Sequence, residues 1–173
     1  VGCLLITLLS HADRVKVACI AQLVNVIAPI MTATGGPAWR QTTFFPFLHA
    51  SRYGRGSALR TIVRSPTYDS RDFTDVPLLE AAAVHNAHKG ELAIFAVNRS
   101  QKEELALSCD LRSFDGFAKV EHILLESRDP KAVNSRDSQN VMPRTASGAQ
   151  VEQGRLSVRL PPLSWNVLRL SRT

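Results

Sequence analysis

Carboxylates are the first candidates for chemistry in this sequence, because two facing carboxyl groups cleave sugar bonds when they lie roughly 5 to 9.5 Å apart. The amino-terminal part offers Asp13 alone, and its neighbour Arg14 makes a surface ion pair the simpler interpretation. Asp69, Asp72 and Asp75 share a polar turn. That turn lacks the glycine and the final glutamate of an EF-hand calcium loop. We therefore expect neither a catalytic carboxylate pair nor a metal site in this chain.

The other reactive side chains are scattered. The five histidines show no spacing typical of zinc ligands, and no phosphate-binding or dinucleotide-binding glycine motif is present, so no cofactor is expected. Cys3, Cys19 and Cys109 are far apart in apolar runs, where cysteine behaves as a small hydrophobic residue. This pattern favours a reduced, intracellular setting.

Gln22 is the candidate binding residue. Residues 15–22 are rich in β-branched side chains and predict a parallel strand that is buried on both faces. If the more apolar set of alternating residues packs under helices, Gln22 points into a barrel at the carboxyl end of its strand, where active sites are built. Its amide would then bond a sugar hydroxyl. A glutamine bonded to loop backbone explains the pattern equally well.

Two tryptophans offer a second way to bind sugar. Trp39 and Trp165 could form a stacking platform. Trp165, however, lies in the apolar sequence Leu-Ser-Trp-Asn-Val, which is typical of a core strand.

The elements around Gln22 indicate an α/β fragment. Residues 1–11 predict a buried helix, and residues 28–41 predict a loop rich in glycine and proline. A second helix should begin at a capping Thr42 or Thr43 and end where Gly54 adopts the left-handed conformation. Pro46 is tolerated there if it lies in the first turn.

After about Arg55 the pattern changes to short strands separated by turns, which predicts an antiparallel β-sandwich of the jelly-roll kind. The alternation is clearest in residues 105–111 and 155–160. Residues 127–154 carry few apolar anchors and predict a long irregular excursion. The expected strands are residues 56–63, 79–85, 92–98, 105–111, 118–125, 155–160 and 165–170.

The charge distribution argues against nucleic acid as a partner. Residues 1–64 contain seven basic groups and one acidic group, so they account for the whole net charge of +6. These charges are spread along the expected elements and form no basic cluster with interleaved aromatic residues. The apolar run at residues 1–10 is about half the length of a membrane span and has no signal-peptide features. We therefore expect no membrane partner.

Three long motifs resemble a known family. Residues 11–16 (HADRVK), 21–30 (AQLVNVIAPI) and 46–56 (PFLHASRYGRG) closely resemble the carboxyl-terminal part of the α-L-arabinofuranosidases of glycoside hydrolase family 51. Shorter matches are Tyr68-Asp69-Ser70, Asp75-Val76-Pro77, Phe95-Ala96-Val97-Asn98-Arg99 and Leu163-Ser164-Trp165-Asn166-Val167.

The resemblance implies a mainly β chain in which residues 1–55 are the last piece of a (β/α)8 barrel (helix, strand 8, helix 8) and residues 56–173 are the β-sandwich. It also implies a retaining mechanism with two glutamates, both upstream of Val1, so this chain has no catalytic residue of its own. Gln22 falls where the family has a glutamine within reach of the arabinofuranosyl unit. The chain opens within a helix pattern and without methionine, so we expect a piece of a longer protein that is inactive alone.

The expected partners follow from this resemblance. They are an arabinose-containing oligosaccharide, bound by the complete enzyme, and the missing barrel portion. The exposed barrel piece should also favour a homo-oligomer, and the expected location is cytoplasmic. The alternative is a non-catalytic β-sandwich accessory module for sugar binding or subunit assembly.

Overall fold

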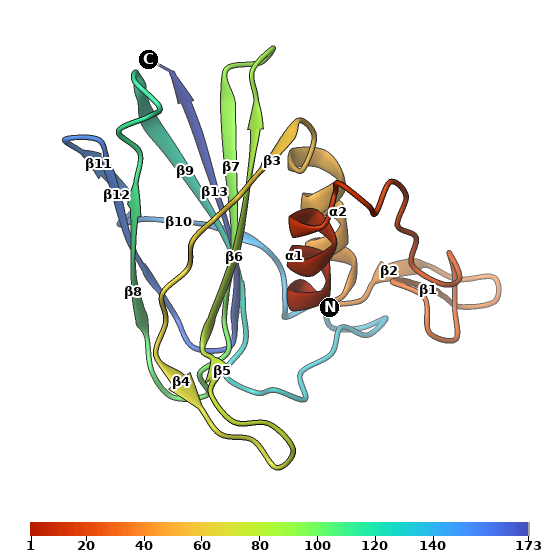
Figure 1. Cartoon of the computed structure of the whole chain (residues 1–173). Coiled ribbons are helices and arrows are strands. Elements are labelled where there is room, and N and C mark those ends of the chain that lie inside the picture. Colours follow the sequence, from red (N-terminus) through yellow and green to blue (C-terminus); the bar gives the residue numbers. More distant parts are fainter. Residues whose placement is uncertain (173) are drawn as a thin grey trace.

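The computed structural model describes residues 1–172, which form two helices and thirteen strands (Figure 1). The elements are α1 (Gly2–Ser10), β1 (Ile30–Thr32), β2 (Ala38–Arg40), α2 (Phe44–Tyr53), β3 (Ser57–Leu59), β4 (Thr67–Tyr68), β5 (Val76–Pro77), β6 (Leu79–Asn86), β7 (Glu91–Asn98), β8 (Leu105–Asp110), β9 (Phe117–Glu126), β10 (Arg144–Ala146), β11 (Gln150–Glu152), β12 (Arg155–Leu160) and β13 (Ser164–Arg172).

Two antiparallel sheets lie face to face, and the helices cover the outer face of the larger one (Figure 1). The larger sheet has six strands in the order β10-β9-β13-β7-β6-β3, and the smaller has three in the order β11-β12-β8. The chain is therefore mainly β, as the sequence predicts, with three layers: small sheet, large sheet and helices.

The first core fills the space between the sheets. Leu156, Val158 and Leu160 of β12 point inward and are buried, while the residues between them are exposed. They pack against Leu168 and Leu170 of β13. The alternation that predicts a half-buried strand is confirmed here.

The second core lies between the large sheet and the helices. Leu5 and Ile6 of α1 and Phe45 of α2 pack with Phe95 of β7 and Trp165 of β13. Because β7 is covered on both faces, its residues 92–97 are all apolar. This explains why the sequence of β7 shows a plain apolar run without alternation.

Six of the seven predicted sandwich strands agree within two residues at each end, and strand 155–160 agrees at both ends. The predicted strand 56–63 is shorter, because β3 spans only Ser57–Leu59, and the two-residue strands β4 and β5 were not predicted. The excursion at residues 127–154, expected to be irregular, contains β10 and β11, each of three residues at a sheet edge. Buried Asn134 anchors this segment, because its side chain bonds the carbonyls of Arg40 and Val141 and the amide of Val141. Such short strands carry too little periodicity to be seen in a sequence.

The second helix forms where expected, with different ends. Thr43 precedes α2 but makes no side-chain capping bond. Gly54 ends the helix with φ −83°, so the predicted left-handed cap is wrong. Glycine is needed there for space, because a Cβ on Gly54 would lie 2.5 Å from the carbonyl oxygen of Ala50. Pro46 does lie in the first turn.

The predicted strand at residues 15–22 is not formed. The segment has no regular secondary structure and is largely exposed, and Cys19 is exposed with it. A parallel strand takes its hydrogen bonds from strands on either side, and none within residues 1–172 pairs with this segment. The predicted loop at residues 28–41 instead contains the hairpin of β1 and β2.

No helix within residues 1–172 is long and apolar enough to cross a membrane.

Candidate functional site

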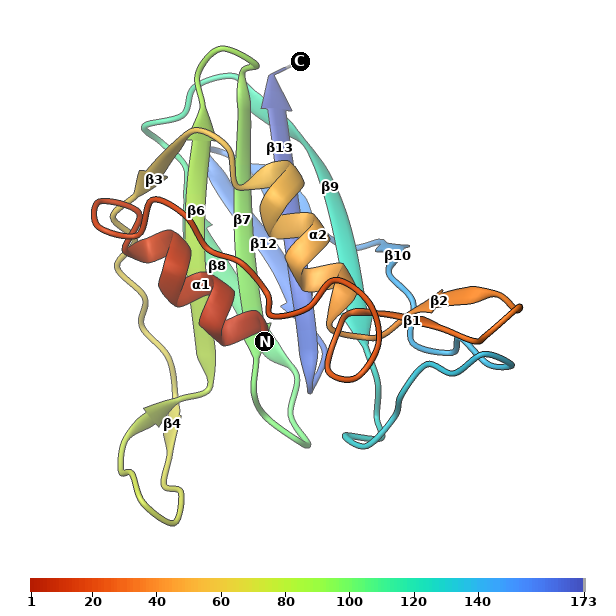
Figure 2. The same cartoon turned by 90° about the vertical axis from the view of Figure 1, so that its right-hand side faces the viewer.

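Gln22 lies in an exposed segment that links α1 to β1. Figure 2 shows this segment crossing the helices on the side away from the sheets. Gln22 is exposed, and its side chain makes no hydrogen bond within residues 1–172. The side-chain amide of Gln22 is therefore available to a ligand. The alternative, in which loop backbone bonds this amide, is not seen within residues 1–172.

The backbone around Gln22 is unusual. Gln22, Asn25 and Val26 have φ values of 58°, 63° and 55°, in the left-handed region. Asparagine tolerates this region, but a β-branched valine rarely adopts it. Strained backbone of this kind clusters at functional sites, so three such residues within five positions mark this loop as a candidate.

Asn25 connects the loop to β1. Its Oδ1 accepts a hydrogen bond from the backbone amide of Thr32 at 2.7 Å, and its Nδ2 donates to Thr32 Oγ1 at 2.9 Å. The backbone amide of Asn25 also donates to the carbonyl of Ile30 at 2.8 Å. Asn25 is thus held by both its main chain and its side chain.

The far end of the loop is buried. Ala28 and Pro29 are enclosed, and the carbonyl of Pro29 accepts a hydrogen bond from the amide of Gln41 at 2.8 Å. One end of the loop is therefore fixed to the helix-and-sheet body, while the end that carries Gln22 is in solvent.

Large apolar side chains are exposed along the same segment. The exposed fractions are 81% for Val17, 75% for Leu23, 79% for Val26 and 69% for Ile27. Soluble proteins rarely leave such side chains exposed together unless another surface covers them. We call residues 15–27 the uncovered segment.

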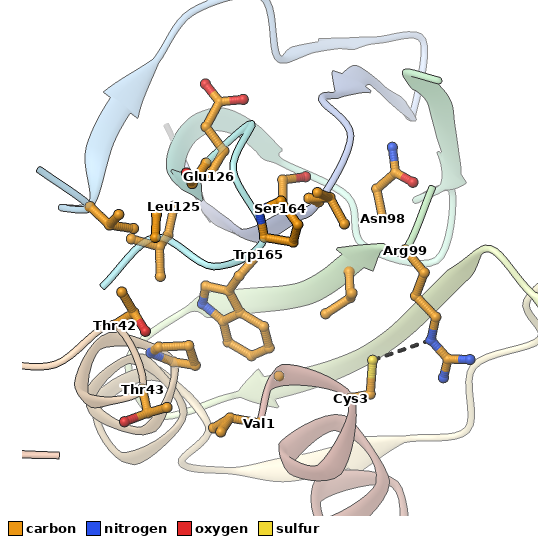
Figure 3. Close-up of a pocket in the computed structure, with 18 of the residues that line it drawn as sticks. Val1, Cys3, Thr42, Thr43, Asn98, Arg99, Leu125, Glu126, Ser164 and Trp165 are labelled. Atoms are coloured by element: carbon orange, nitrogen blue, oxygen red, sulfur yellow. Dashed lines mark hydrogen bonds between the residues drawn. The ribbon is translucent and has the colours of Figure 1, made fainter. Parts of the chain in front are cut away.

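A pocket of about 520 Å³ opens where the first residues of α1 and α2 meet the ends of β7, β9 and β13 (Figure 3). The indole of Trp165 forms part of its wall. Gly2 lies against that ring, because a Cβ at this position would be 2.8 Å from it.

Two charged side chains of this pocket, Arg99 and Glu126, are paired with partners from neighbouring elements. Arg99 donates to Cys3 Sγ at 3.3 Å and forms an ion pair with Glu80, and Glu126 pairs with Arg144. Paired charges of this kind hold neighbouring elements together. The pocket is thus better described as the junction between helices and sandwich than as a catalytic site.

His49 of α2 and Trp165 of β13 form the buried link of that junction. The indole Nε1 donates to His49 Nδ1 at 3.1 Å, so the imidazole is neutral with its proton on Nε2. Burial, and then the nearby charge of Arg52, lowers the pKa of His49 to about 4. Trp165 is only 5% exposed, which excludes it from a sugar-stacking platform and confirms it as a core residue.

The remaining candidates are structural. Asp13 pairs with Arg14 at the surface, as predicted. Asp69 Oδ1 accepts the amide of Asp75 and closes the loop between β4 and β5. Within residues 1–172, no group of three or more His, Cys, Asp or Glu residues is arranged to hold a metal ion.

Sequence reasoning missed two features of the site. The only signal for the bond between His49 and Trp165 was the apolar surroundings of both residues, which cannot reveal a contact 116 positions apart. Asn25 gave a clearer signal, because asparagine is common in turns and tolerates the left-handed region.

Comparison with known proteins gives a consistent result. The family Alpha-L-arabinofuranosidase C-terminal domain matches residues 1–164. An intracellular exo-α-(1→5)-L-arabinofuranosidase of Halalkalibacterium halodurans is 58% identical over 172 residues, which cover 99% of this chain and 34% of that protein. The intracellular exo-α-(1→5)-L-arabinofuranosidase 1 of Bacillus subtilis is 51% identical, with the same coverage.

Solved structures agree. A family 51 α-L-arabinofuranosidase from Bifidobacterium longum superimposes with a TM-score of 0.91 at 37% identity, over 98% of this chain and 33% of that one. The chain spans about a third of the length of the curated relatives it matches.

Proposed function

This chain belongs to the family of α-L-arabinofuranosidase C-terminal domains, and we propose that it works as the carboxyl-terminal part of an intracellular enzyme that removes terminal α-L-arabinofuranosyl groups. The substrates are arabinose-containing oligosaccharides derived from arabinan or arabinoxylan. Support comes from two relatives above 50% identity that are named intracellular exo-α-(1→5)-L-arabinofuranosidases.

The observation that carries this proposal is the uncovered segment. Its residues 15–22 have no strand partner within residues 1–172, and the segment exposes Val17, Leu23, Val26 and Ile27. A segment of this composition is suited to lie between other strands and beneath other helices. In the proposed enzyme, residues 1–55 complete a (β/α)8 barrel and residues 56–173 form the appended sandwich.

The catalytic and substrate-binding roles can be assigned to the two parts of the proposed enzyme from the residues that this chain contains. A retaining glycosidase needs a nucleophilic carboxylate and an acid/base carboxyl group. We assign both to the part of the enzyme that pairs with the uncovered segment. This chain contributes the amide of Gln22, which bonds a hydroxyl of the arabinofuranosyl ring. No metal or cofactor enters this mechanism.

A chimera tests the proposal. The chain would replace the matching third of the Halalkalibacterium halodurans relative, with which it shares 58% identity. We expect the chimera to hydrolyse an aryl α-L-arabinofuranoside. A folded chimera, judged by circular dichroism and sedimentation, that shows no hydrolysis would contradict the proposal.

The chain alone is the matching control. It should not hydrolyse the same substrate above buffer background, because the steps that lower the barrier need the absent carboxylates. Titration with arabino-oligosaccharides should also show no binding. Binding by the isolated chain would favour the accessory sugar-binding module instead.

A further inference from the structure

One side chain holds the exposed part of the loop that carries Gln22. Among residues 17–31, Asn25 alone makes side-chain hydrogen bonds within the described chain. These bonds reach the amide and the hydroxyl of Thr32 at 2.7 and 2.9 Å. The apolar neighbours Leu23, Val26 and Ile27 are exposed and cannot hold the loop by packing.

Asparagine suits this position for two separate reasons. With φ 63°, residue 25 must tolerate the left-handed region, which glycine and asparagine do most readily. The amide also supplies an acceptor for Thr32 N–H and a donor for Thr32 Oγ1, a combination that neither aspartate nor alanine offers. We call the two side-chain hydrogen bonds from Asn25 to Thr32 the clasp. Substitution by glycine removes the clasp and keeps the left-handed conformation, so the two contributions can be measured separately.

The clasp acts close to Gln22. Two residues separate Gln22 from Asn25, and between them Val24 forms a bridge with Ile30. Because the side chain of Gln22 has no partner within residues 1–172, its direction depends on the hydrogen bonds that follow it in the chain.

We infer that Asn25 is a positioning residue: its clasp on Thr32 fixes the loop so that the amide of Gln22 meets the sugar. This inference rests on the proposed function, since Gln22 contacts substrate only in the complete enzyme. Asn25 itself does not touch the substrate.

The test uses the chimera and the variants N25G, N25D and Q22A. N25G keeps the left-handed backbone and removes the clasp, so kcat/KM should fall about three- to tenfold, the loss of one or two hydrogen bonds. N25D keeps the acceptor for Thr32 N–H and should recover part of this loss. In the Q22A background, N25G should lower kcat/KM by less than about twofold, because the two residues act through one contact.

A second measurement, amide hydrogen exchange, tests the hydrogen bonds between Asn25 and Thr32 without an activity assay. In the 173-residue chain, hydrogen exchange at the amide of Thr32 should be faster in N25G than in wild type. The matched control is N86G, which removes the bond from Lys89 N–H to Asn86 Oδ1 in the turn after β6. It should leave both kcat/KM and Thr32 exchange unchanged.

The outcomes are distinct. Unchanged Thr32 exchange in N25G, or a full N25G loss that persists in the Q22A background, overturns the inference while the proposed function stands. An inactive wild-type chimera overturns the proposed function, and the role of Asn25 falls with it.

Discussion

Gln22 is a polar residue whose side chain has no hydrogen-bond partner within residues 1–172, in a segment that is otherwise mostly apolar. Its free amide and its left-handed backbone both fit a side chain that is presented to a ligand. The sequence was enough to identify Gln22 as a candidate binding residue, because it is a polar residue at the end of an apolar run. It could not predict the backbone conformation, because that depends on the clasp between Asn25 and Thr32 seven positions away.

A substitution at Gln22 tests its role. In the active chimera, Gln22→Ala should lower kcat/KM by about five- to a hundredfold, because a neutral hydrogen bond is lost and a buried partner is left unsatisfied. If the bond strengthens as the sugar ring flattens, most of the loss will appear in kcat. Steady-state kinetics with an aryl α-L-arabinofuranoside measure both constants.

Gln153→Ala is the control for this experiment. Gln153 is also exposed and also left-handed, with φ 48°, but it lies in the turn between β11 and β12. It should leave kcat/KM unchanged. A Gln22→Ala variant within about twofold of wild type, less than about 0.4 kcal/mol, would rule out the sugar contact.

At the scale of elements, prediction succeeded where a strand's own residues determine its burial. The alternation in β12 and the apolar run in β7 identify both strands. It failed for residues 15–22, because a strand also needs partners, and for the short strands β10 and β11, because three residues show no period. The contact between α2 and β13 was also beyond the sequence, since it joins His49 to a residue far along the chain.

The bond between α2 and β13 makes stability depend on pH. The pKa of His49 is lowered to about 4 from an ordinary 6.5. Between these two pH values His49 is therefore protonated in the unfolded chain and neutral in the folded chain. Through His49 alone, the free energy of unfolding should therefore fall as pH drops from about 6.5 to about 4, by at most about 1.4 kcal/mol per pH unit. Burial also lowers the pKa of His122, which adds to the same trend.

Urea unfolding between pH 4 and 8 measures this effect. His49→Gln should be less stable than wild type at pH 7.5 and should show a shallower loss toward acid. His88→Gln, a change at an exposed turn residue, should follow the wild-type curve. Equal pH slopes for wild type and His49→Gln would contradict the assignment.

At the scale of the whole molecule, the uncovered segment should drive association. The isolated chain should self-associate at tens of micromolar, because Leu23 and Ile27 expose apolar surface that a stable monomer would cover. Sedimentation of the double variant Leu23→Ser/Ile27→Ser should show a shift toward monomer. Phe73→Ser, at another exposed apolar residue in the loop between β4 and β5, should not change the distribution. A compact wild-type monomer at the same concentration would disprove this expectation.

The place of β13 at the centre of the large sheet sets the order of folding during synthesis. The two strands that flank it, β7 and β9, precede it by dozens of residues, and neither pairs with the other. Until β13 is made, β10-β9 and β7-β6-β3 remain separate pieces with exposed edges, and α1 lacks Trp165 and Val167 to pack against. At a synthesis rate of about 5 to 20 residues per second, the nascent chain spends several seconds in this open state. Closing the large sheet therefore waits for contacts between residues that are far apart in the sequence.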